Sequence, residues 1–155
     1  MLNRLRDVFE SLQRHEVRYV VIGGIAAILH GVPRATLDLD LLIDPTPDNA
    51  ARLLAALFEA GLGTATLLTA EELLANEITV FNDFVRIDVQ TRTPGLLFNA
   101  AWERRATMTY QKQAFYVVSI ADLLSSKKAA GRPKDFEDVR VLEANAPPQD
   151  PLESP

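Results

Sequence analysis

Apolar and polar positions alternate along the chain with two different periods, and these periods predict an alternation of helices and strands. The N-terminal segment has the helical period, with apolar side chains at Leu2, Leu5, Val8, Phe9 and Leu12. A β-branched run follows it, which is typical of a strand. The elements predicted in the first half are a strand at 17–22, a helix at 25–29, a strand at 37–43, a helix at 48–60 and a short helix capped by Thr69 and Glu72.

Glycine and proline residues mark the ends of these elements. We expect Gly23-Gly24 to turn the chain from the first strand into the following helix. That helix is expected to end at His30-Gly31, because Pro33 blocks its continuation. Gly61 gives the longer helix a glycine stop.

The second half contains more strand-like segments. Two apolar runs flank Asn82-Asp83 and predict a hairpin. In the second run apolar and polar residues alternate, which places Asp88 on the polar side of its strand. The other predicted elements are a helix at about 96–103, short strands at 108–110 and 115–118, and helices at 119–130 and 133–143.

This order of elements predicts one α/β domain, of the α+β kind, in which helices flank a mixed β-sheet. We assign residues 1–144 to the domain and expect residues 145–155, which are rich in proline and acidic residues, to form a disordered tail. A chain of 155 residues is long enough to bury a core without help from a metal or a disulfide.

Composition narrows the class of protein. The balance of 16 Lys and Arg against 21 Asp and Glu gives a net charge of −5, which argues against a whole surface that binds nucleic acid and leaves room for a local basic patch. The absence of Cys excludes disulfides, Cys-ligated zinc and thiol nucleophiles. No secretory signal is visible, and the longest apolar run, 19–29, is shorter than the roughly 20 residues that span a bilayer. We therefore expect a cytoplasmic protein without membrane contact.

Two carboxylates interrupt the apolar strand at 37–43. Residues two apart in a strand face the same way, so Asp38 and Asp40 form one acidic face. Their repulsion, roughly 2.5 kcal/mol at an effective dielectric near 20, raises one pKa or is relieved by a cation. With Asp88 from a neighbouring strand they form a fitting set of oxygen ligands for one or two Mg²⁺ ions. The alternate side chains are expected to enter the core: Leu37, Leu39 and Leu41.

The residues around the acidic strand are suited to a triphosphate. Gly23 and Gly24 lie between a strand and a helix, where the backbone approaches a ligand closely and a helix N-terminus offers N–H groups. Arg34 and Thr36 add a bidentate phosphate donor and a hydroxyl. A late basic segment is suited to face a nucleotide or an RNA end; its cations are Lys127, Lys128, Arg132 and Lys134.

The order of these motifs resembles the nucleotidyltransferase superfamily that includes DNA polymerase beta and kanamycin nucleotidyltransferase. Gly-Gly is followed, fourteen residues after Gly24, by Asp-Leu-Asp, and then by a separate strand Asp. Within that superfamily the chain is similar to the small minimal nucleotidyltransferases of type IV-like toxin-antitoxin modules. These share an Arg-x-Thr-x-Asp-h-Asp strand, here 34–40, and a late Lys-x-x-Ala-Gly-Arg-x-Lys-Asp segment, here 127–135. The resemblance covers about residues 17–142.

The resemblance implies the nucleotidyltransferase fold and a metal-dependent transfer of a nucleoside monophosphate from an NTP to an acceptor hydroxyl. The acceptor can be an RNA such as tRNA, a protein or a small molecule, and a cognate antitoxin is a further partner that the resemblance implies. It implies metal binding and catalysis by Asp38, Asp40 and Asp88. It implies that Gly23 and Gly24 hold the triphosphate and that Lys127 contacts the nucleotide. From their residue types we also expect Arg34, Thr36 and Arg132 to bind the nucleotide.

Other interpretations stay open at this point. The acids can form an ordinary solvated strand face, and the late cations can complement helix dipoles and nearby acids such as Asp135. Gly24 stands where many relatives have a serine that contacts phosphate, so a catalytically inactive nucleotide-binding or partner-binding module on the same fold is the alternative function. A metal-dependent nuclease is disfavoured, because the Glu-x-Lys pattern of nucleases is missing after the strand Asp.

Overall fold

The strands of the computed structural model form one six-stranded mixed sheet with the order β3-β4-β2-β1-β6-β5. The structure describes residues 2–36 and 38–146, with only the backbone of Leu2, so the predictions for Leu37 and for residues 147–155 of the expected tail lie outside the described residues. The strands are β1 (Tyr19–Ile22), β2 (Asp38–Ile43), β3 (Ile78–Asn82), β4 (Arg86–Gln90), β5 (Ala106–Tyr110) and β6 (Gln113–Val117).

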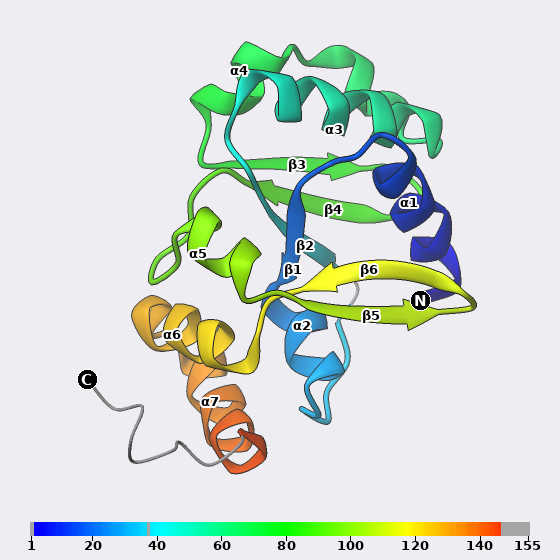
Figure 1. The fold of residues 1–155 in the computed structure, drawn as a ribbon. Helices are drawn as coiled ribbons and strands as arrows, with labels where there is room; N and C mark the ends of the chain where they lie inside the picture. The colour runs from blue at the N-terminus through cyan, green and yellow to red at the C-terminus, as the bar shows by residue number, and fades with distance from the viewer. Residues whose placement is uncertain (1, 37, 147–155) are drawn as a thin grey trace.

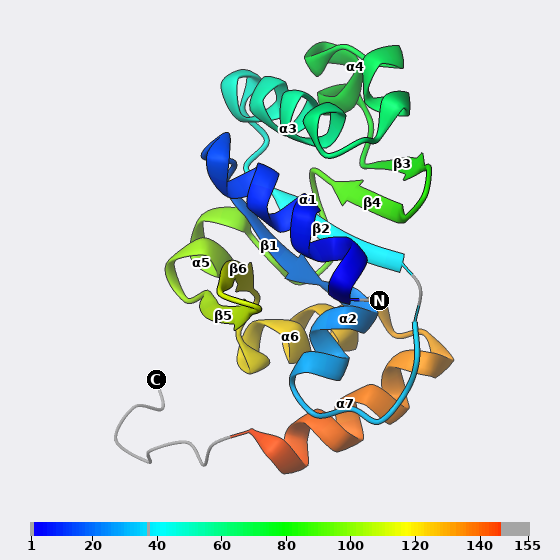
Figure 2. The same ribbon diagram turned by 90° about the vertical axis from the view of Figure 1, so that its right-hand side faces the viewer.

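Helices lie on both sides of this sheet (Figures 1 and 2). Figure 1 shows α3 and α4 beside β3 at the top and α2, α6 and α7 together at the bottom, and Figure 2 shows α1 lying across β1 and β2. In the part of the chain that the structure describes, no helix is long and apolar enough to cross a membrane. The helices are α1 (Leu2–Arg14), α2 (Gly23–Leu29), α3 (Pro47–Glu59), the 3₁₀ helix η1 (Gly63–Leu67), α4 (Ala70–Ala75), α5 (Phe98–Glu103), α6 (Ile120–Ala130) and α7 (Pro133–Asn145).

The two faces of the sheet differ in chemistry, as the alternation in β2 and β4 predicts. On one face Leu39, Leu41, Ile87 and Val89 are fully or almost fully buried. The apolar stripe of α1 covers the same face over β1 and β6, where the Phe9 ring stacks on other aromatic rings. The opposite face of β2 and β4 carries the carboxylates, so burying one face leaves the other available for a ligand.

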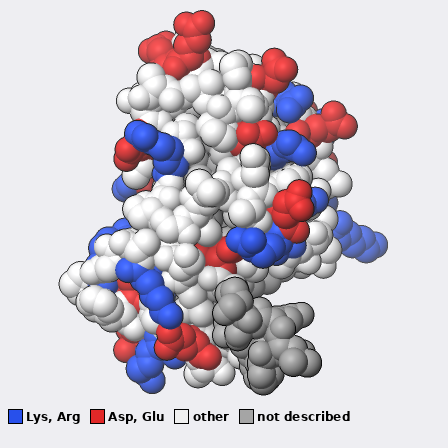
Figure 3. Space-filling model, turned by 60° about the vertical axis from the view of Figure 1, so that its left-hand side comes forward, with Lys and Arg blue, Asp and Glu red and all other residues white. Residues whose placement is uncertain are grey.

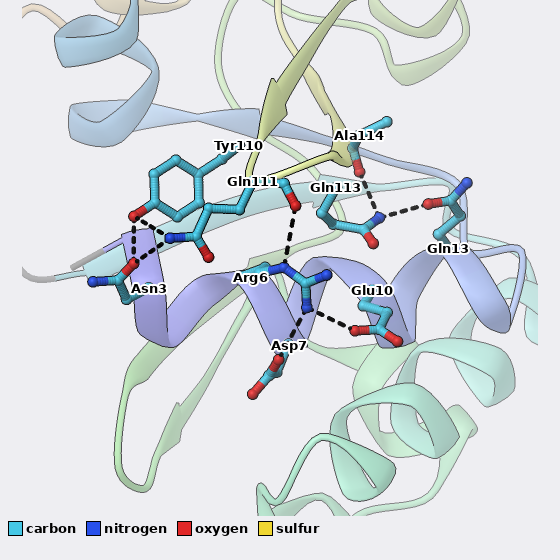
Figure 4. A network of polar contacts seen from close by, with 9 residues as sticks. All are labelled: Asn3, Arg6, Asp7, Glu10, Gln13, Tyr110, Gln111, Gln113 and Ala114. Carbon is cyan, nitrogen blue, oxygen red and sulfur yellow. Dashed lines mark hydrogen bonds and ion pairs between the residues drawn. The ribbon is translucent and has the colours of Figure 1, made fainter.

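Polar side chains of α1 also fix the position of the β5–β6 hairpin (Figure 4). The Tyr110 hydroxyl donates a hydrogen bond to the side-chain oxygen of Asn3, and Arg6 donates to the Gln111 carbonyl. Gln111 and the next residue have positive φ angles, as a two-residue hairpin turn requires. The hairpin is thereby attached to the helix that covers the core.

The predicted mixed α/β fold and the order of its predicted elements are confirmed. The differences concern boundaries and one short element. α2 begins at Gly23 instead of residue 25, and β2 is described from Asp38. The hairpin loop is 83–85, because Asn82 still pairs with Arg86. The 3₁₀ helix η1 was not predicted, since a single irregular turn leaves no periodic pattern.

Candidate functional site

Strand pairing brings the three predicted carboxylates to one cavity. β2 and β4 run parallel with Asp40 directly opposite Asp88 and Asp38 opposite Arg86. All four side chains line a cavity of about 330 Å³. Two segments about 50 residues apart in the chain therefore supply one acidic wall.

The carboxylate of Asp40 has an unusual affinity for protons. Burial and, after it, the charges of Asp88 and Asp38 together raise its pKa to about 6, against the opposing charges of Lys134 and Arg132. The charged form of Asp40 is thus disfavoured both by desolvation and by its acidic neighbours. A cation at this place would relieve the repulsion.

The guanidinium of Arg86 supplies positive charge beside these carboxylates. Its Nε lies 3.0 Å from Oδ1 of Asp88 and 3.7 Å from Oδ2 of Asp38, and a second nitrogen donates to Asp88 at 3.3 Å. The guanidinium thus bridges two of the three predicted metal ligands. In this arrangement no group of three or more His, Asp or Glu side chains among the described residues is disposed to hold a metal ion.

The carboxylates nevertheless fit a divalent cation in their chemistry. Three hard oxygen donors from adjacent strands are the ligands that Mg²⁺ prefers. The bridging guanidinium shows that Asp38 and Asp88 attract a cation, and the Arg86 side chain that supplies it is 45% exposed. Asp38, Asp40 and Asp88 therefore have the donor atoms that such an ion takes, and metal binding by them stays a prediction.

The glycine pair is required by close packing against this wall. Gly23 has a φ of +68°, and a Cβ atom there would overlap the Oδ2 atom of Asp40. A Cβ atom on Gly24 would lie 2.8 Å from a terminal nitrogen of Arg34 and 3.3 Å from the Thr36 side chain. The Arg34 guanidinium thus lies beside the space that a side chain at position 24 would fill.

The late basic segment reaches the cavity through a buried ion network. Lys127 is 4% exposed, and its Nζ lies 2.8 Å from Asp138 and 3.3 Å from Asp135. Asp138 also lies 3.1 Å from Arg34, and Arg132 donates hydrogen bonds to Asp135. These contacts of Asp138 Oδ2 are ion pairs and not well-aligned hydrogen bonds.

The network has consequences for both interpretations of the segment. Burial raises the pKa of Asp135, but the hydrogen bonds from Arg132 and the charge of Lys127 lower it below its usual value. Lys127 and Arg132 thus pair with nearby acids, as expected if these cations serve to stabilise the fold. Lys127, Arg132 and Lys134 also line the same cavity as the carboxylates.

The cavity therefore unites all the predicted site residues: Asp38, Asp40, Asp88, Gly23, Gly24, Arg34, Thr36, Lys127 and Arg132. Sequence reasoning did not select Arg86, Gln90, Thr93, Ser126 or Asp138. Arg86 and Gln90 lie two residues either side of Asp88 and so share its face, a signal that was available in the sequence. Thr93 and Ser126 had no such signal.

Among the described residues, the face in Figure 3 has no large patch of charges of one sign. Lys and Arg side chains are interspersed there with Asp and Glu side chains. Positive charge near the carboxylates therefore comes from individual residues that line the cavity, such as Arg34 and Lys134.

Comparisons with known proteins agree with this fold. A family model described as "Nucleotidyltransferase of unknown function (DUF6036)" matches residues 2–144. A Thermotoga maritima crystal structure, provisionally named a nucleotidyltransferase, is 15% identical, with a TM-score of 0.58 over 94% of this chain and 93% of its own. An antigenic nucleotidyltransferase-like protein from Paracoccidioides brasiliensis is 18% identical, with a TM-score of 0.59 over 95% of this chain and 77% of its own. A search of curated proteins finds no significant match.

Proposed function

The chain belongs to a family of nucleotidyltransferases of unknown function, and from this premise we propose that it transfers a nucleoside monophosphate from an NTP to an acceptor hydroxyl. The observation that carries the proposal is the meeting of Asp38, Asp40 and Asp88 with the glycine turn and the late cations in one cavity. The carboxylates suit a divalent metal ion, and the glycines and the Lys and Arg side chains suit phosphate. One cavity thus contains groups that can bind both the metal ion and the phosphates of a metal-bound triphosphate.

In the reaction the acceptor oxygen forms a bond to the α-phosphorus, and the bond between that phosphorus and the pyrophosphate oxygen breaks. Arg34 and Arg132 hold the triphosphate and receive the charge of the departing pyrophosphate. In this proposal Asp88 takes the proton of the acceptor hydroxyl. A Mg²⁺ ion held by the three carboxylates would supply charge neutralisation and orientation of the phosphates.

The test is label transfer with Mg²⁺ and each α-labelled NTP, offered total tRNA, total protein and small alcohols as acceptors. We expect label in one acceptor class, and Asp38→Asn should abolish it, because the amide loses the charge that holds the cation. Asp7→Asn is the matched control, since that side chain is 76% exposed on α1. Full transfer by Asp38→Asn would show that the site is misassigned.

A second candidate function is a nucleotide-binding or partner-binding module on the same fold that has no catalytic activity. The observation that favours it is that Arg86 forms ion pairs with two of the three expected metal ligands, Asp38 and Asp88. NTP binding with no transfer to any acceptor would support the module over the enzyme.

A role as the toxin of a toxin-antitoxin pair is a finer proposal, which rests on the motifs at 34–40 and 127–135. It places the protein in the cytoplasm, with a cognate antitoxin as its partner. Expression of the wild-type chain should then arrest growth, and Asp38→Asn should not. Growth arrest by both proteins, or by neither, would contradict this role.

A further inference from the structure

The cavity has two chemically different ends. At one end Gly24 approaches Arg34 and Thr36, and Gly23 approaches Asp40. Arg132 lines the same cavity, so this end has the cations and the close backbone that phosphate requires. It is the phosphate end.

The other end has no unpaired charge among the described residues, and we call it the neutral end. Ile78 pairs with Gln90 across β3 and β4, two residues beyond Asp88. α6 lines the cavity with Leu123, Ser126, Lys127 and Ala130. The charge of Lys127 is already paired with Asp135 and Asp138, so the other groups on these walls are apolar or uncharged.

The loop that follows β4 belongs to this neutral end because it packs on α6. A Cβ atom on Gly95 would lie 2.6 Å from the Ser125 carbonyl and 2.8 Å from the Ala129 side chain. The loop and the helix are thus in direct contact. Thr93, just before this contact, and Ser126 on α6 both line the cavity.

Three polar groups at the neutral end are left for a ligand. The side chains of Gln90, Thr93 and Ser126 are half-buried, and within the described residues none of them makes a hydrogen bond. Their amide and hydroxyl groups can each donate and accept. Apolar walls with a few free polar groups are typical of sites for small planar ligands.

We propose that the neutral end holds the nucleoside of the NTP, with the base against the exposed side chain of Ile78 and its polar edge read by Gln90. The inference rests on the proposed function and adds which residues select the substrate. A side-chain amide can pair with the edge of a base through one donor and one acceptor, as Gln does with adenine.

The test compares the affinities of an NTP and of inorganic tripolyphosphate, both with Mg²⁺. Tripolyphosphate has no base, so it reports the phosphate end alone. Ala130→Leu fills the neutral end and should weaken NTP binding about tenfold or more, with tripolyphosphate binding unchanged. Ala121→Leu, at an exposed position of the same helix, should change neither affinity.

A second variant keeps the test independent of helix packing. Gln90→Leu should reduce the ratio between the tightest and weakest of the four common NTPs, again with tripolyphosphate unchanged. Equal losses for NTP and tripolyphosphate in Ala130→Leu and Gln90→Leu, or no loss for either ligand, would overturn the inference.

The wild-type chain separates this inference from the proposed function. Binding of NTP more tightly than tripolyphosphate supports both. Equal affinities would overturn the nucleoside site and leave the proposed function standing, whereas binding of neither ligand would overturn the proposed function.

Discussion

Asp40 has a raised pKa, and this gives the stability of the protein a definite pH dependence. The pKa is about 6 in the folded chain, against an ordinary value of 3.8. Between these values the folded state binds more protons than the unfolded state, so the free energy of unfolding falls as pH rises from about 4 to about 6 and then levels off.

Asp40→Asn removes this dependence because an amide does not ionise. We expect the variant to be more stable than the wild type by about 1–3 kcal/mol at pH 8, with the difference vanishing near pH 4. Urea unfolding at several pH values measures it. Asp7→Asn should show no such trend, and a constant difference for Asp40→Asn would rule out the raised pKa.

Arg86 competes with a divalent cation for the same carboxylates. Arg86→Gln removes the guanidinium from Asp88 and Asp38 and should tighten Mg²⁺ binding about tenfold, because the bound ion no longer displaces an ion pair. Titration calorimetry of the nucleotide-free protein measures the change. Arg92→Gln, which removes an exposed pair with Glu77, is the control; unchanged affinity in Arg86→Gln would mean that the guanidinium does not compete.

At the scale of elements, the junction of β1 and α2 depends on a glycine. Gly23→Ala would meet the Oδ2 atom of Asp40 and would strain a left-handed backbone. We expect a loss of about 2 kcal/mol or more in the free energy of unfolding, together with weaker divalent binding. Gly63→Ala is the matched control, since a Cβ atom there meets nothing within 4 Å. Equal effects of the two substitutions would contradict the close approach.

The contact between α6 and α7 depends on the buried acid Asp138. Asp138→Asn leaves Lys127 with Asp135 alone and removes the counter-charge of Arg34. The expected loss is about 3 kcal/mol in urea unfolding, because breaking a buried ion pair leaves charge uncompensated. Glu137→Gln, at a side chain 66% exposed on the same helix, should change the free energy of unfolding much less than Asp138→Asn does. A similarly small loss in Asp138→Asn would show that the network is not stabilising.

Elements were predictable from the chain where a period or a cap was present. The alternation of Leu39 and Leu41 with carboxylates predicted both the strand and its faces, and the Thr69 capping box is present as expected. The hairpin loop was placed one residue early, because Asn82 can serve either as a turn residue or as the last strand residue. Such boundaries depend on backbone pairing that side-chain pattern does not encode.

For the whole molecule, the residue types of the site were predictable and their mutual contacts were not. Carboxylate spacing indicated the cation chemistry, but the register that sets Asp40 opposite Asp88 and Arg86 beside Asp38 appears only in the sheet. Lys127 was expected to contact nucleotide, and in the structure it pairs with Asp135 and Asp138 at the cavity wall. Its contact with nucleotide and the domain boundary at residue 144 stay predictions.

The most direct test of the central claim, that Asp38, Asp40 and Asp88 hold a divalent cation against a triphosphate, is the binding of Mn²⁺ followed by electron paramagnetic resonance. In the wild type we expect bound Mn²⁺ whose affinity rises when an NTP is added, and Asp38→Asn should lose both effects. Mn²⁺ binding that is absent in the wild type with and without an NTP, or that Asp38→Asn retains in full, would contradict the claim.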